Sequence, residues 1–298
     1  MSLTSGEIRV GISGWTYASW RGDFYPTGLP HTRELTYAAE RMTSVEVNGS
    51  FYSLQRPTSY ARWRDATPAD FVFAVKGSRF ITHMKQLVDV DVALANFWAS
   101  GVLALGPKLG PILWQLPARS RFDQQRLADF FDRLPRSTSE AAGLARGHDE
   151  KVPEARALVD AVDERPIRHV LEARHASFAT LEAAELLRAN DIGSVWADAA
   201  GKFPVIDQDT SDVRYVRLHG HTELYASGYS SRSLDQWAVR CRSWAESGRD
   251  VYVYFDNDIR GRAPWDAVGL LQRLERPSRY GPAWPSPPRR RSTGRGRR

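Results

Sequence analysis

The chain has 298 residues, a hydrophobic fraction of 42% and a formal net charge of +6, values typical of a globular protein with a sizeable core. Its single cysteine, Cys241, excludes an internal disulfide and a cysteine-rich zinc site. No stretch approaches the roughly 18 apolar residues of a membrane span, and the start lacks a basic segment followed by an apolar run. We therefore expect a cytoplasmic protein that does not contact a membrane.

Positive charge is concentrated at the C-terminal end of the chain. Residues 276–298 contain eight arginines and no acidic residue, so residues 1–275 carry a net charge of −2. This tail is rich in Arg, Pro, Gly and Ser and is predicted to be disordered, because it cannot bury a core. It is either a solvated extension or an arm that binds nucleic acid weakly and non-specifically.

Short β-branched or aromatic segments alternate with segments of helical periodicity through residues 1–275. This alternation predicts a parallel sheet, and eight such units favour a single (β/α)8 TIM-like barrel over an open doubly wound sheet. The sequence has no G-x-G-x-x-G after its first predicted strand and no P-loop motif. Strands are predicted at residues 8–15, 44–51, 71–77, 111–117, 168–174, 193–198, 213–220 and 250–257.

Helices are predicted between these strands, with two irregular places. Residues 199–212, after the sixth strand, are too polar and proline-broken for a helix, so the sixth βα unit is expected to be incomplete. Residues 139–164, before the fifth strand, read as a helical insertion that is too short for a second domain. The predicted helices span residues 32–42, 58–68, 89–105, 123–134, 180–189, 233–246 and 264–274.

Strand alternation assigns side chains to the inside or the outside of the barrel. In residues 44–51, Val45 and Val47 form the apolar class and should face the helices, which leaves Glu46 and Asn48 inside. The same interpretation places these residues inside: Lys76, Gln115, Glu172, Arg174, Trp196, Asp198, Tyr215, Arg217, His219, Tyr252, Tyr254 and Asp256.

The inward class contains many charges near the C-terminal ends of the strands, where barrels of this type have their active sites. Buried charges are costly unless they are paired or used in function. Taken singly, Glu46 and Glu172 could be halves of structural ion pairs, and His219 could bind a loop backbone. Because at least six strands contribute polar residues, we predict a functional pocket.

The loops that follow the strands supply further candidate contacts. Cationic side chains after the third strand and glycine-rich backbone after the seventh suit an anionic substrate, and loop aromatics could wall a pocket and stack on a ring. The predicted substrate-binding residues are Trp15, Tyr17, Asn48, Phe51, Tyr52, Arg79, His83, Gln115, Arg174, His175, Asp198, Arg217, Gly220, Tyr229, Asp256 and Asn257.

Seven elements, at residues 11–26, 45–57, 71–87, 110–123, 171–178, 215–220 and 252–267, resemble those of the YecE-like family, domain of unknown function 72, and occur in that family's order. The resemblance covers roughly residues 8–274. It implies a TIM-like barrel and assigns no activity. Ala173, Ala176 and Phe178 depart from the family's aromatic, proline and tryptophan, so the pocket near the fifth strand is expected to differ in shape.

Three functions fit these residues. The first is an enzyme of the hydrolase, lyase or isomerase kind that acts on a small phosphate- or carboxylate-bearing molecule, with Glu46, Glu172, His219 and Lys76 as catalytic residues. The second is a metal-dependent phosphoesterase or isomerase with Glu46, Glu172, His219 and Asp256 around a divalent cation, although no metal-ligand spacing supports it and no metal ligand or cofactor is assigned. The third is a non-catalytic barrel that associates with a ligand or nucleic acid.

Overall fold

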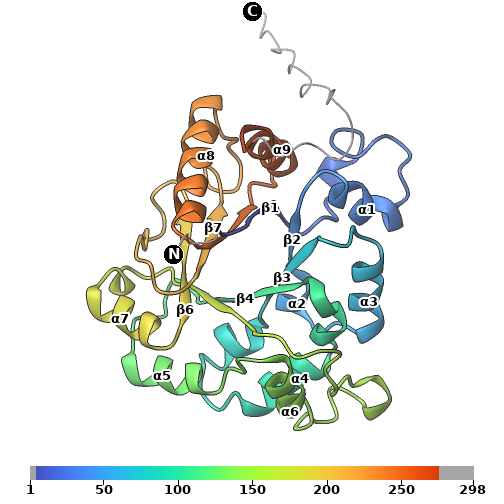
Figure 1. Ribbon diagram of the computed structural model, residues 1–298, viewed down its shortest axis with the longest axis vertical. Helices are drawn as coiled ribbons and strands as arrows, with labels where there is room; N and C mark the ends of the chain where they lie inside the picture. Colours follow the sequence, from blue (N-terminus) through green and yellow to red (C-terminus); the bar gives the residue numbers. More distant parts are fainter. Residues whose placement is uncertain (1–4, 275–298) are drawn as a thin grey trace, which may run out of the picture.

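The computed structural model describes residues 5–274, and the arginine-rich tail at 276–298 lies outside the described residues. Its eight strands are all parallel and close into a barrel in sequence order, with β8 paired to β1 (Figure 1). The predicted barrel and its eight strands are confirmed. The strands are β1 (Ile8–Ser13), β2 (Ser44–Val47), β3 (Val72–Lys76), β4 (Leu109–Gln115), β5 (His169–Glu172), β6 (Ile192–Asp198), β7 (Val213–Leu218) and β8 (Asp250–Phe255).

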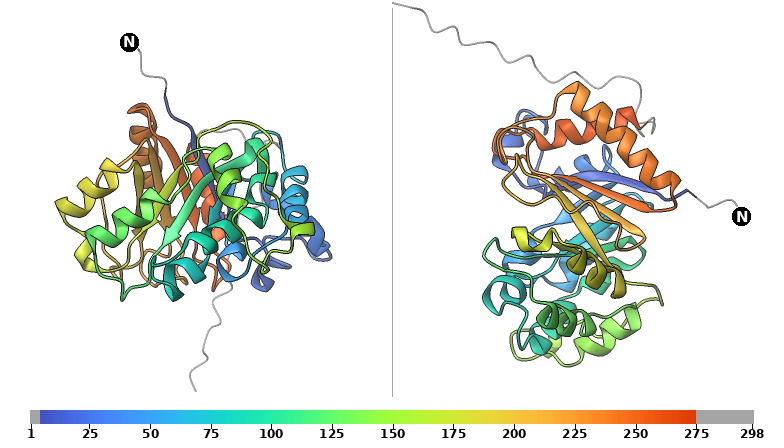
Figure 2. Two further views of the ribbon diagram at one scale, coloured as in Figure 1. Left: turned by 90° about the horizontal axis from the view of Figure 1, so that it is seen from below. Right: turned by 90° about the vertical axis from the view of Figure 1, so that its left-hand side faces the viewer.

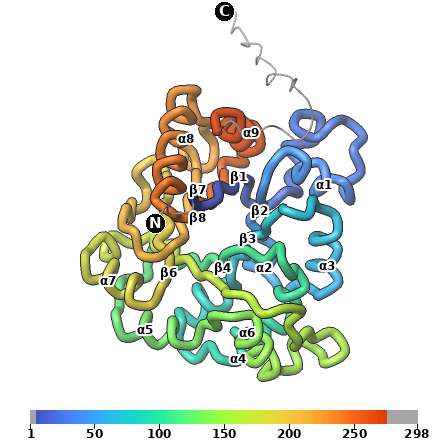
Figure 3. The backbone as a smooth tube through the Cα atoms, in the orientation of Figure 1, coloured from blue at the N-terminus to red at the C-terminus, as the bar shows by residue number. Residues whose placement is uncertain are grey.

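Helices pack around the outside of the strands, as the two side views show (Figure 2). The chain circles the barrel once, so α9 returns to pack beside β1 (Figure 3). Within residues 5–274, no helix has the length and apolar character to cross a bilayer. The α-helices are α1 (Glu34–Ala39), α2 (Gly49–Tyr52), α3 (Pro57–Asp65), α4 (Asp91–Ala99), α5 (Gln124–Asp132), α6 (Thr138–Ala145), α7 (Leu181–Ala189), α8 (Ser231–Glu246) and α9 (Ala263–Arg273).

Local sequence explains where several of these helices begin. The side chains of Asp123, Thr180 and Ser230 each accept a hydrogen bond from a backbone N–H in the first turn of α5, α7 and α8, which satisfies a donor that the helix itself leaves free. Residues 139–164, predicted as a helical insertion, begin within α6, which packs on α4. Residues 199–212 link β6 to β7 through turns, bends and irregular backbone, and these described residues contain no helix.

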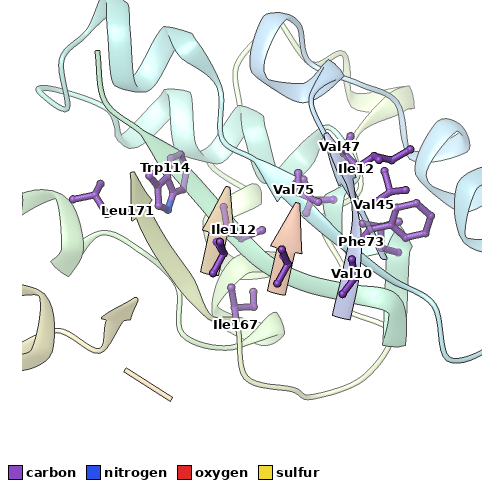
Figure 4. Packing of buried hydrophobic residues seen from close by; sticks show 14 of the residues in the cluster. Val10, Ile12, Val45, Val47, Phe73, Val75, Ile112, Trp114, Ile167 and Leu171 are labelled. Atoms are coloured by element: carbon purple, nitrogen blue, oxygen red, sulfur yellow. The ribbon is translucent and has the colours of Figure 1, made fainter. Parts of the chain in front are cut away.

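The buried apolar residues form two layers, one on each side of the strands. The outer layer lies between strands and helices and includes Val45 and Val47 (Figure 4). The inner layer fills the barrel with Ala74, Leu113, Val170, Val195, Val213, Tyr215, Tyr252 and Tyr254. The predicted orientation of β2 is therefore confirmed, and Glu46 faces the barrel interior.

Strand β6 has the opposite orientation to the one predicted. Val195 belongs to the inner layer, so Trp196 and Asp198 face outward, and Trp196 packs edge-on against Trp237 of α8. The outer face of β6 is covered by α7 and α8 and, at Ser194, by residues 199–212. The backbone carbonyls of residues 199–212 need hydrogen-bond donors. Ser194 on the outer face of β6 supplies one, since its hydroxyl donates to the Gln208 carbonyl at 2.6 Å. On β6 the alternating set that contains the polar residues Ser194 and Asp198 therefore faces outward.

Candidate active site

A single guanidinium organises the charges at the C-terminal end of the barrel. Arg217 on β7 is 1% exposed and forms ion pairs with three carboxylates. Its nitrogens lie 2.8 Å from Glu46, 2.7 Å from Glu172 and 2.9 Å from Asp256. Arginine suits this position because its planar fork offers several donors in fixed directions. We call these four residues the Arg217 cluster.

Glu46 is held on all sides within this cluster. Its Oε1 accepts hydrogen bonds from Arg217 at 2.8 Å and from the Ser13 hydroxyl at 2.9 Å, and its Oε2 accepts from Arg217 at 3.0 Å and from the Tyr215 hydroxyl at 2.7 Å. The side chain is fully buried. Each oxygen of this carboxylate accepts two hydrogen bonds, so Glu46 is well suited to fix Arg217 in place. It has little hydrogen-bonding capacity left for a substrate.

Glu172 and Asp256 are also held as anions. Burial opposes ionisation of Glu172, but Arg174 and Arg217 outweigh it and hold the pKa of this carboxyl well below its usual value. Burial likewise opposes ionisation of Asp256, and Arg217 and the adjacent His219 lower its pKa to about 2. His219 Nδ1 lies 2.9 Å from Asp256 Oδ2. Both carboxylates therefore balance the positive charge of the arginines.

The residues proposed for a divalent cation do not fit one. Within residues 5–274, no group of three or more His, Cys, Asp or Glu side chains is placed to hold a metal ion. Arg217 lies among Glu46, Glu172 and Asp256 and uses the oxygens that a cation would need. The donor set is thus that of a cationic side chain rather than of a metal.

A pocket of roughly 350 Å³, the mouth pocket, opens above this cluster. Arg217 and Asp256 form part of its lining, while Glu46, Glu172 and His219 lie beneath it. The other lining residues come from seven different strand ends or loops, and they are Tyr17, Asn48, Phe51, Tyr52, Lys76, Gln115, Arg174, Tyr225, Asp258 and Ile259.

Lys76 is the most unusual group in this lining. It is 7% exposed, and its Nζ lies 4.3 Å from the centre of the Phe51 ring. No carboxylate among the described residues lies within ion-pairing distance of it. Burial and the nearby charge of Arg217 lower the pKa of Lys76 to about 8. Arg174 differs, because it donates to Glu172 at 2.6 Å and to Gln115 at 3.0 Å.

Asp258 is a lining residue that the sequence reasoning missed. Burial and the negative charge of Asp256 raise the pKa of Asp258 well above its usual value, and its Oδ1 is buried without a hydrogen-bond partner in the described part of the chain. Continuing the alternation of β8 by two residues beyond Asp256 would have found it. Tyr225 was also missed, and it contacts the His219 ring edge-on at 5.3 Å.

The predicted residues after β3 lie at the rim of the mouth pocket. His83 packs edge-on against Phe51 at 5.1 Å, and burial together with Lys76 and Arg174 lowers its pKa to about 4. Arg79 is exposed and lies 5.7 Å from the centre of the Tyr52 ring. The cationic side of the pocket is therefore the side formed by β3 and β5.

Several predicted site residues lie away from the mouth pocket. Asp198 accepts a hydrogen bond from the Tyr229 hydroxyl at 3.0 Å, and the same hydroxyl accepts one from the Gly220 N–H at 3.2 Å. Asn257 donates to Asp266 at 2.8 Å and ties the chain after β8 to α9. His175 Nδ1 accepts from the Ser177 N–H at 3.1 Å and caps a short turn. These contacts fix loops, and Asp198 is on the outer face of β6.

Comparison with known proteins identifies relatives. Residues 9–291 match the family model described as "Protein of unknown function DUF72". The chain is 22% identical to the UPF0759 protein YunF of Bacillus subtilis over 90% of this chain and 95% of that protein. It is 30% identical to the UPF0759 protein YecE of Escherichia coli K12 over 129 residues, 43% of this chain and 44% of that protein, so this match spans less than half of YecE. A DUF72 family protein from Thermotoga maritima has the same fold, with a TM-score of 0.71 at 24% identity over 91% of this chain and 100% of that one.

Proposed function

The chain belongs to the DUF72 family, and we propose that it is an enzyme that uses acid and base catalysis on a small anionic substrate in the mouth pocket. The observation that carries this proposal is the buried ammonium of Lys76, which is 7% exposed and has no carboxylate partner among the described residues. Burying an unpaired charge is costly. A phosphate or carboxylate group of a substrate would supply the missing partner.

The charges behind Lys76 favour this role. Glu46, Glu172 and Asp256 form direct ion pairs with Arg217 and Arg174, whereas none of them lies within ion-pairing distance of Lys76, so an anion in the mouth pocket would find Lys76 free to form a direct pair. Arg174 and Arg217 also line the pocket and would stabilise negative charge that develops during the reaction. We assign Glu46, Glu172 and His219 to positioning these groups, because all three lie beneath the pocket.

Lys76 and Asp258 are the proposed proton-transfer residues. The Lys76 ammonium that pairs with the substrate anion has a pKa of about 8, so it can donate a proton near neutral pH and take one back as the amine, and an aspartic acid with a raised pKa can donate another. Both line the same pocket. The substrate would bind between two groups that can transfer protons, an arrangement that serves isomerisation, elimination or hydrolysis.

Binding can be tested with a thermal-shift screen of phosphate- and carboxylate-bearing metabolites. We expect ligands that stabilise the wild-type protein and fail to stabilise Lys76→Met. Lys151→Met is the matched control, because Lys151 also lies over a phenyl ring, at 5.2 Å from Phe80, but is exposed at the surface. Ligands that stabilise Lys76→Met as strongly as the wild type would place the binding site elsewhere.

Catalysis is tested separately, with a substrate from that screen. Asp258→Asn keeps the shape of the side chain and removes the acidic proton, so we expect unchanged binding and a kcat lower by about 10²-fold or more. Full activity of this variant would reject Asp258 as the acid. Sulfate, which does not titrate in this range, should bind less tightly as the pH rises through about 8, because Lys76 loses its charge there.

A further inference from the structure

A second pocket of roughly 570 Å³ lies beside the mouth pocket, and we call it the side pocket. Tyr17, Asn48 and Tyr52 line both pockets, so the two share a wall near the C-terminal ends of β1 and β2. The side pocket is bordered by residues of α1, α2 and α3, which lie along one flank of the barrel (Figure 1). A ligand anchored at Lys76 would therefore have this space within reach.

The lining of the side pocket differs in chemistry from that of the mouth pocket. Trp15 and Trp63 are half-buried and meet edge to face at 5.2 Å, and Leu35 and Val47 add aliphatic surface. No acidic residue is among its lining residues. Tyr52 is 67% exposed at the shared wall. Half-buried aromatic rings beside aliphatic surface suit a planar ring, because faces and edges of π-systems pack favourably.

Asn48 adds a polar requirement at the shared wall. It occupies the residue before α2, where an asparagine side chain usually caps the helix, but here it makes no capping hydrogen bond. Its Oδ1 is buried and has no partner in the described chain. Buried polar atoms are almost always hydrogen-bonded, so this amide is available to a ligand that bears a hydrogen-bond donor.

We propose that the substrate has two parts, an anionic group that pairs with Lys76 and a planar, nitrogen-bearing ring that occupies the side pocket. The anionic half rests on the function proposed above. Tyr17, Asn48 and Tyr52 would contact the portion that joins the two parts, and Asn48 would bind a donor on the ring or its link. The substrate class is thus a ring-bearing phosphate or carboxylate of about the size of a nucleoside monophosphate.

Isothermal titration calorimetry of the full chain with three matched probes tests this inference. Adenosine 5′-monophosphate has both parts, ribose 5-phosphate lacks the ring, and adenosine lacks the anion. We expect the monophosphate to bind about tenfold more tightly than ribose 5-phosphate, because stacking on aromatic side chains stabilises a bound base. In Trp15→Leu, the monophosphate should bind within about twofold of ribose 5-phosphate, whose own affinity should not change.

Further variants separate a binding role from a folding role. Asn48→Ala should also weaken the monophosphate more than ribose 5-phosphate, whereas Trp15→Phe should retain most of the difference between them. Trp244→Leu is the matched control. Trp244 of α8 is also half-buried beside a tryptophan ring, that of Trp196 on the outer face of β6, and it lines neither pocket. This variant should leave the affinities for all three probes unchanged.

The outcomes distinguish this inference from the function on which it rests. Equal affinity of the wild type for the monophosphate and for ribose 5-phosphate, both lost in Lys76→Met, would overturn the ring site and support the anion site. The opposite result has two parts: adenosine binding is lost in Trp15→Leu, and ribose 5-phosphate binds Lys76→Met as tightly as the wild type. This result would support the ring site and overturn the anion site. Failure of all three probes to bind would overturn the two-part substrate.

Discussion

The two ends of the barrel both carry clustered charges, and they use them differently. At the N-terminal end, a pocket of roughly 800 Å³ is bordered by Arg168 and Asp250. Arg168 donates to Asp250 at 2.6 Å and to the Tyr252 hydroxyl at 2.8 Å, and the two charged side chains are 27% and 30% exposed. At the C-terminal end, Arg217 is 1% exposed and pairs with three carboxylates.

The size of the pocket and the burial of its charges therefore single out opposite ends of this barrel. In the larger pocket Arg168 and Asp250 are partly solvated and paired with each other, and the smaller one contains a buried lysine with no carboxylate within ion-pairing distance in the described chain. Water screens and solvates the first set, so its pairs contribute little to stability. The second set is removed from water, so the free-energy cost of burying each of its charges must be offset by ion pairs and hydrogen bonds with its neighbours.

The largest expected effect is the loss of the buried guanidinium. Arg217→Met leaves Glu46, Glu172 and Asp256 without their shared cation, and we expect the free energy of unfolding to fall by about 3–5 kcal/mol. Arg168→Met should lower it by about 1 kcal/mol or less, because its partners are partly solvated. Urea unfolding at neutral pH measures both. Equal losses in the two variants would contradict the contrast between the ends.

Lys76→Met should have the opposite sign. The pKa of Lys76 lies at about 8 in the folded protein, below its usual 10.5, so protonated Lys76 destabilises the fold below pH 8. We expect the variant to be more stable than the wild type by about 1–3 kcal/mol at neutral pH. The advantage should shrink as the pH rises from 8 towards 10.5. Thermal unfolding across this range gives the answer, and a destabilised variant would show that Lys76 has a protein partner.

Asp258→Asn should have a smaller effect of the same sign. Its folded-state pKa is raised, so the protonated carboxyl favours folding, and this contribution is lost as the pH rises through the folded pKa. The amide cannot ionise, so the variant should gain up to about 1 kcal/mol over the wild type at neutral pH and nothing in acid. Unfolding measured at both pH values tests this, with Asp212→Asn at the N-terminal end as the exposed control.

The smallest effect concerns salt. Because Arg168 and Asp250 are partly solvated, the destabilisation caused by Arg168→Met should decrease by roughly 0.3–0.5 kcal/mol at about 1 M sodium chloride. The effect of Arg217→Met should change less, because buried pairs are screened weakly. Urea unfolding at low and high salt measures the two differences. A stronger salt effect at Arg217 would mean that water reaches the Arg217 cluster.

Part of the site could be read from strand alternation, because most strands have one clearly apolar class. Val45 and Val47 against Glu46 is such a case, and the structure has this orientation. In β6 the class without polar residues, Gly193, Val195 and Ala197, faces the barrel interior, and the mixed class with Trp196 and Asp198 faces outward, so the rule that the apolar class faces the helices fails there. The outer cover of that strand includes α8 at Trp196 and residues 199–212 at Ser194, and alternation within β6 contains no information about this cover.

The chemical roles were harder to predict than the positions. Glu46 and Glu172 were expected to act on a substrate, but they lie beneath the pocket and bind Arg217. Which carboxylate is paired and which is free depends on neighbours that come from distant parts of the chain. Asp258 became a candidate only when its burial, its place in the pocket lining and the charge of Asp256 beside it were known.

The sequence by itself determined the barrel, its eight strands and most inward-facing charges, because alternation and helical periodicity are local properties of the chain. Tertiary structure alone decided the partners. Closing the barrel brings Glu46 of β2 and Arg217 of β7 to 2.8 Å across 171 residues of sequence, while Lys76 is buried over the Phe51 ring with no carboxylate of the described chain within ion-pairing distance. Pairing depends on distances between strands that are remote in sequence, and only the closed barrel sets them.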